Sequence, residues 1–218
     1  LPSQYDPETN KQTTVTQEVN LVSVDPLFGK LDWVAGFFYL NTEVEISILE
    51  RLDFGRDGFD PFTRQDVLDD ANCCDKGFIS DSKPERDSAS VYGQGTWNFN
   101  DDLRAVFGLR FTKDEVYSEV TNFYGAYGTD IIETSSEKVT GRLVIEHDFN
   151  ESTMAYGSYT RGFKPGGSNL TYGKEDTIAP IVVLPTFEEE IVDAYEIGLK
   201  TDLADGRVRL NTAAFYYN

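Results

Sequence analysis

Ionisable side chains are the residues of this chain best suited to chemistry. The sequence has 38 Asp and Glu, 19 Lys and Arg and one His in 218 residues, with a net charge of -19. Paired carboxylates hydrolyse glycosidic bonds when held roughly 5 to 9.5 Å apart, but this many acids offer no preferred pair. There is also no Ser-His-Asp order and no nucleophile elbow. We therefore predict no enzyme and no catalytic residue.

Metal and redox chemistry have few candidates. One Met and one His leave little for a metal centre, and the acidic stretch from Asp53 to Gly58 lacks the spacing of an EF-hand. Cys73 and Cys74 are the only cysteines. Neighbouring Cα atoms lie about 3.8 Å apart, below the usual disulfide range of roughly 4.4 to 6.8 Å, so a vicinal disulfide would be strained. We hypothesise that disulfide, with two free thiols as the alternative, and predict no metal and no cofactor.

The overall charge excludes one further class of partner. A sequence pI near 4.3 makes a phosphate-binding surface improbable, so nucleic acid is not an expected partner.

The elements that must position these side chains are extended. Alternating apolar and polar residues predict about eight strands. Their connections differ in length, with tight turns at Asn100-Asp101-Asp102, Asn150-Glu151 and Asp205-Gly206 and long polar stretches at 49–86, 119–136 and 164–189. Short turns at one rim and long loops at the other are typical of an outer-membrane β-barrel. The expected strands are 13–23, 31–47, 87–99, 103–118, 137–149, 152–163, 190–202 and 207–217.

Within these strands the alternation separates a lipid face from a lumen face. Leu103, Phe107 and Phe111 alternate with arginines, and arginine at lipid midplane would cost roughly 2 to 4 kcal/mol. In 152–163, Arg161 faces the lumen only if Met154 and Tyr156 face lipid. Lumen-facing candidates for ligand binding are Arg104, Arg110, Arg142, Glu146, Arg161, Glu196 and Arg209.

Two turns fix strand register. The apolar residues on both sides of Asn100-Asp101-Asp102 have odd numbers, so only an odd-length turn keeps both sets on one face. Asp205-Gly206 predicts a type I′ hairpin that pairs Tyr195 with Tyr216 and Asp202 with Arg209.

Several motifs together resemble one family. They are Gln17-Glu18-Val19-Asn20-Leu21, the segment 156–167 (YGSYTRGFKPGG) and Tyr195-Glu196-Ile197-Gly198-Leu199-Lys200 followed by 210–217. This combination resembles the β-barrel of the TonB-dependent receptors of Gram-negative outer membranes. The resemblance implies that residues 1–218 are a section of a 22-stranded barrel, with the plug domain outside the chain. It also implies uptake of a scarce nutrient such as an iron chelate (siderophore), cobalamin or an oligosaccharide.

The partners implied by this resemblance are outer-membrane lipid and lipopolysaccharide, the ligand, and the TonB complex acting through the plug. Two other interpretations stay open. One is a self-contained eight-stranded outer-membrane barrel with a structural or adhesive role. The other is a soluble carbohydrate-binding β-sandwich.

Overall fold

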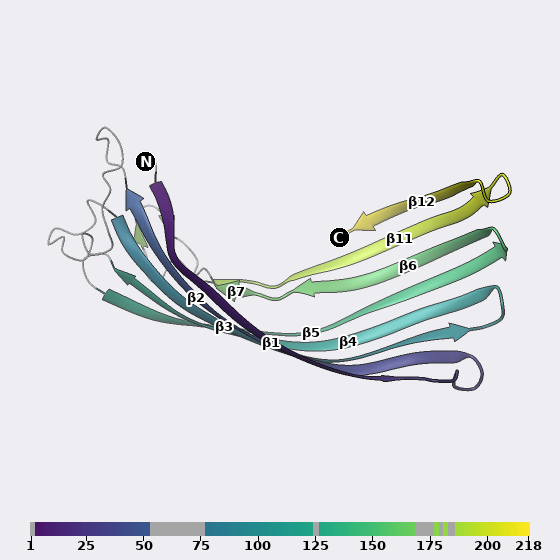
Figure 1. The fold of residues 1–218 in the computed structure, drawn as a ribbon, viewed down its shortest axis with the longest axis horizontal. Helices are drawn as coiled ribbons and strands as arrows, with labels where there is room; N and C mark the ends of the chain where they lie inside the picture. Colours follow the sequence, from purple (N-terminus) through teal and green to yellow (C-terminus); the bar gives the residue numbers. More distant parts are fainter. Residues whose placement is uncertain (1–2, 53–76, 124–126, 169–176, 179–180, 183–185) are drawn as a thin grey trace.

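The computed structural model is an extended, curved antiparallel sheet (Figure 1). It describes residues 3–52, 77–123, 127–168, 177–178, 181–182 and 186–218. No helix in these ranges is long and apolar enough to cross a membrane. The main strands are β1 (Ser3–Val22), β2 (Leu31–Leu52), β3 (Gly77–Asn98), β4 (Leu103–Phe123), β5 (Tyr127–Asn150), β6 (Thr153–Lys164), β11 (Glu190–Leu203) and β12 (Val208–Tyr217).

Four two-residue strands lie between β6 and β11. They are β7 (Gly167–Ser168), which pairs with β10 (Thr186–Phe187), and β8 (Thr177–Ile178), which pairs with β9 (Ile181–Val182).

The sheet is an open up-and-down meander. Its order is β1-β2-β3-β4-β5-β6-β11-β12, so β1 and β12 each pair with one neighbour only. The antiparallel all-β prediction is confirmed. A closed eight-stranded barrel is wrong for the described residues, because closure would pair β1 with β12. A sandwich is also wrong for them, because no second large sheet covers either face.

Strands on the long-connection side run further than the alternation predicted. β2 continues to Leu52, β3 begins at Gly77, and β4 and β5 together occupy most of 119–136. Here Ser, Thr and charged residues stand on both faces, so the hydropathy signal fades while backbone pairing continues. The boundaries of these four strands were therefore predicted about five to ten residues short.

The two faces of the sheet differ in composition. One, the apolar face, carries large side chains that stay exposed, with Leu109 68% and Ile197 67% accessible. On β4 this band runs from Leu103 to Phe111, where Lys113 follows it on the same face, and on β11 it runs from Tyr195 to Leu203. The opposite, polar face carries Arg104, Arg110 and Glu146. Arg104 and Arg110 alternate with the apolar residues of β4, and Glu146 pairs across the strands with Arg104.

The apolar band crosses the hydrogen-bonded rows diagonally. Phe107, at the centre of the β4 band, is in one row with Leu143, Tyr159 and Tyr195, which is the end of the β11 band. The band therefore shifts by four residues over three strand steps. Such a stagger is what tilted strands produce in a barrel wall.

A bulge at the β5–β6 turn reverses one predicted orientation. Register shifts between Asp148 and Asn150, so Asp148 pairs with Met154 and Gly141 with Arg161. One extra residue moves every following side chain of the strand to the other face. Met154 and Tyr156 consequently lie on the polar face and Arg161 on the apolar face. The prediction that Arg161 faces the lumen is wrong for this reason.

The other two turns match their predictions. Phe99 donates its N–H to the Leu103 carbonyl at 2.9 Å, so Asn100-Asp101-Asp102 is a three-residue connection. In the last hairpin Tyr195 pairs with Tyr216 and Asp202 with Arg209. Asp205 and Gly206 have φ values of 55° and 79°, as a type I′ turn requires. Ala204 also takes a positive φ of 53°, so the ladder closes one pair earlier, at Leu203 and Val208.

Candidate functional site: the polar face of the sheet

Two tyrosines on the polar face lie over glycines and hydrogen-bond to glutamates. Tyr92 of β3 covers Gly36 of β2, and its hydroxyl donates to Glu18 of β1. The hydroxyl also lies 2.5 Å from the side-chain oxygen of Asn20. A Cβ atom at Gly36 would overlap the Tyr92 ring, so only glycine lets the ring cross this strand. The arrangement links three strands through side chains as well as backbone.

A similar arrangement occurs at the other end of the sheet. Tyr156 of β6 covers Gly198 of β11 and donates its hydroxyl to Glu196. Lys200 Nζ lies 5.4 Å from the centre of the Tyr156 ring, within cation–π range. Both carboxylates are thus held by a neighbouring phenol and oriented along the polar face.

Several cations of this face are already neutralised. Arg104 binds Glu146 at 2.5 Å and Asp148 at 2.7 Å. Arg209 binds Asp202 at 2.7 Å through Nε and 2.9 Å through Nη2. These ion pairs brace neighbouring strands, so their charges are satisfied within the wall.

Arg110 and Arg142 differ from these cations. Neither has a carboxylate within ion-pair distance among the described residues. The Arg110 guanidinium lies 5.4 Å from the ring centres of both Phe38 and Tyr92, which fixes its position. Arg142 is exposed and lies two rows away, paired with Gly108. A hollow of about 260 Å³ lies at this point, lined by both arginines and by Gln94.

One ion pair joins β5 to the residues just before β11. Lys138 forms an ion pair with Glu189, which lies outside the strands. The hydrogen bond from Lys138 holds the pKa of the Glu189 carboxyl below its usual range, against a smaller opposing effect of desolvation.

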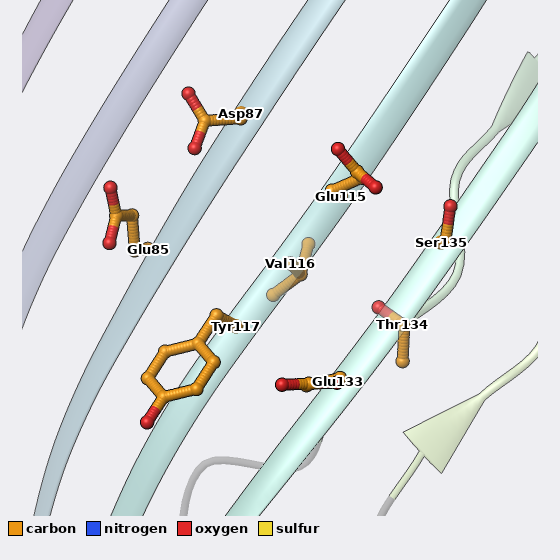
Figure 2. Close-up of a pocket in the computed structure, with 8 residues that line it drawn as sticks. All are labelled: Glu85, Asp87, Glu115, Val116, Tyr117, Glu133, Thr134 and Ser135. Atoms are coloured by element: carbon orange, nitrogen blue, oxygen red, sulfur yellow. The ribbon is translucent and has the colours of Figure 1, made fainter.

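On the opposite side of the sheet, which carries the apolar band, carboxylates gather where the strands extend past that band. Figure 2 shows Glu85 and Asp87 from β3, Glu115 from β4 and Glu133 from β5 around a hollow of about 410 Å³. Asp87 accepts a hydrogen bond of 2.6 Å from the Tyr39 hydroxyl. No group of three or more metal ligands occurs within the described ranges, these acids included. This part of the wall is therefore a negatively charged surface.

The ligand-binding candidates predicted from the sequence do not all lie on the same face of the sheet. Arg104, Arg110, Arg142, Glu146, Glu196 and Arg209 share the polar face, and Arg161 lies on the other face. Cys73 and Cys74 fall outside the described residues. Sequence reasoning did not single out the Tyr92–Glu18–Asn20 contacts. The alternation had placed Tyr92 on this face, but its partners lie on strands far away in sequence.

An antiparallel meander with a tilted apolar band on one face and a charged network on the other defines a section of a large β-barrel wall. Comparison with known families agrees. Residues 2–218 match the family described as "TonB dependent receptor-like, beta-barrel". The chain belongs to the TonB-dependent receptor family.

Individual relatives are similar over part of their length. The metal-pseudopaline receptor CntO of Pseudomonas aeruginosa is 25% identical over 133 residues, which are 61% of this chain and 17% of that protein. The ferric yersiniabactin uptake receptor FyuA of Yersinia pestis gives a TM-score of 0.72 at 19% identity, covering 95% of this chain and 28% of that structure. The siderophore receptor PiuA of Acinetobacter baumannii gives 0.67 at 19%, covering 94% and 31%. The chain thus spans less than a third of each.

Proposed function

We propose that residues 1–218 form part of the barrel wall of an outer-membrane receptor that imports a metal chelate of the siderophore type. The observation that carries this proposal is the two-sided wall. Its apolar face exposes large side chains over nine residues of β4, about the length that a tilted strand needs to cross a membrane. Its polar face carries fixed charges suited to a water-filled lumen. The relatives named above are receptors for chelated metals, which supports this class of cargo.

Within this wall we assign the cargo-facing role to Arg110 and Arg142. The other predicted cations are neutralised by carboxylates of the wall, whereas these two form no ion pair among the described residues and lie beside a hollow. Guanidinium groups bind carboxylate or catecholate oxygens of an anionic chelate through paired hydrogen bonds. The protein acts by binding and passage, with no covalent step, and the plug and the TonB complex act outside these residues.

Uptake of radioactive iron by cells tests the function. Cells lacking the intact receptor should lose uptake of at least one ferric chelate supplied under iron limitation, and the intact gene should restore it. Arg110→Gln with Arg142→Gln should lower uptake while leaving receptor abundance unchanged. Arg207→Gln, in the exposed last turn, makes the same chemical change away from the hollow and is the control. If cells lacking the receptor took up every ferric chelate at the normal rate, the proposal would be refuted.

A further inference from the structure

A groove of about 590 Å³ crosses the apolar face over Gly157 of β6. Gly157 lies in one row between Ile145 and Ile197, whose side chains form its two walls. A Cβ atom at Gly157 would meet nothing within 4 Å. The floor of the groove is therefore open because a glycine stands between two large aliphatic residues. Tyr195 and Tyr216 also line the groove.

Strand pairing joins the strands edge to edge and leaves the face of the sheet over this groove uncovered. β6 is paired on both sides, with β5 and β11, so the floor of the groove at Gly157 lies within the wall, and the groove extends from there to the terminal strand β12. Its walls remain exposed, with Ile197 67% and Tyr216 64% accessible. The groove is continuous with the apolar band, so an apolar occupant is the one that its surface favours.

A polar cluster lies beyond one end of the groove. Arg161 lies on the same face four residues beyond Gly157, about 13 Å along the strand. Its Nε and Nη2 each donate to Asp193 at 2.7 Å, and the Tyr159 hydroxyl donates to the same carboxylate at 2.8 Å. These contacts use two of the five guanidinium N–H donors and leave three. The Arg161 side chain is 48% exposed and Asp193 only 17%, so the guanidinium remains accessible from outside the sheet.

Aromatic rings separate the groove from this cluster. The ring centres of Tyr159 and Tyr195 lie 5.1 Å apart, and those of Tyr195 and Tyr216 lie 6.4 Å apart. Tyrosine rows mark the boundary between hydrocarbon and headgroups in membrane proteins. Arg161 therefore stands at headgroup level, on the side of the wall where the long connections lie.

We propose that the groove binds one anionic acylated lipid of the outer leaflet, with an acyl chain over Gly157 and a phosphate on Arg161. Asp193 and Tyr159 hold the guanidinium in place, so its outward edge is ready to bind phosphate oxygens in the paired geometry that arginine favours. This lipid site belongs to the apolar face of the wall, and lipid binding there does not depend on the imported chelate.

Native mass spectrometry of the purified full-length receptor, supplied with bis-phosphorylated lipid A, tests the site. Wild type should retain one lipid A molecule. Gly157→Leu fills the groove and should weaken retention about tenfold or more, as expected for an acyl segment that loses a few methylene contacts. Arg161→Gln should weaken it similarly. Gly93→Leu places the same side chain elsewhere on the apolar face, with only the Val34 carbonyl within 4 Å, and should retain lipid A normally.

Three results would overturn the proposal. One is equal retention by Gly157→Leu and Gly93→Leu. Another is equal binding of dephosphorylated and bis-phosphorylated lipid A by wild type. The third is a change in the oligomeric mass of Gly157→Leu without a change in lipid retention, which would make the groove a contact between copies. If Gly157→Leu does not fold, Ile197→Ala removes one wall instead and should also weaken retention.

Discussion

Phe107→Arg tests the membrane-facing assignment of the apolar face most directly. Phe107 is the middle residue of the β4 band from Leu103 to Phe111, and its side chain is 45% exposed. Nine residues span about 26 Å along the strand, or about 20 Å of thickness at a tilt of about 40°. Phe107 should therefore lie near the bilayer midplane, where a charge is most costly.

The expected cost follows from this depth. An arginine on the lipid face at midplane destabilises a barrel by about 2–4 kcal/mol, and the value falls toward zero near the interfaces. Phe107 also covers Gly95, because a Cβ atom built there would lie 2.8 Å from its ring. Losing this contact adds to the cost. Since about 1.4 kcal/mol is a factor of ten, the equilibrium constant for unfolding should rise by at least about 30-fold.

The measurement is equilibrium unfolding of the full-length receptor in phospholipid vesicles with guanidinium chloride. Thr96→Arg is the matched control, because Thr96 lies on the polar face in the neighbouring row, directly across from Asp32. An arginine there gains an acidic neighbour and should cost little. Equal destabilisation by the two variants would refute the assignment of the faces.

Three further predictions concern the turns, a pH effect and the register. Asn100→Ala removes a side-chain oxygen that accepts two backbone N–H groups at 3.0 and 2.7 Å, and should destabilise the receptor by about 1 kcal/mol in the same unfolding assay. The pKa of Glu189 is lowered in the folded state. Its ion pair with Lys138 therefore contributes its full stabilisation above the pKa that Glu189 has in the unfolded chain, and this stabilisation is lost as pH falls through the pKa in the folded chain. Hydrogen exchange of residues 186–190, corrected for intrinsic rates, should then accelerate in acid, and Glu189→Gln should abolish that change. Cysteines at Ile197 and Ala214 should form a disulfide on oxidation, whereas cysteines one row out of register should not.

The sequence by itself determined the architecture and two of the registers. Alternation along 103–111 assigned the faces of β4, and turn chemistry at 100–102 and at Asp205-Gly206 fixed which residues pair across those hairpins. These features are local, because a turn and a period of two depend only on neighbouring residues. The strand ends were less predictable, since Ser- and Thr-rich stretches pair through backbone without an apolar face to mark them.

The tertiary structure decided what depends on contacts between distant strands. A single bulge before β6 moved Arg161 from the polar to the apolar face, and no residue type at 149–152 announces that bulge. The contact of Tyr92 with Glu18 joins residues 74 positions apart in the chain. Which arginines are neutralised and which stay free likewise depends on carboxylates supplied by neighbouring strands. Side-chain partners of this kind depend on the registers of several successive strand pairs. An error of one residue in any hairpin reverses the faces of the next strand.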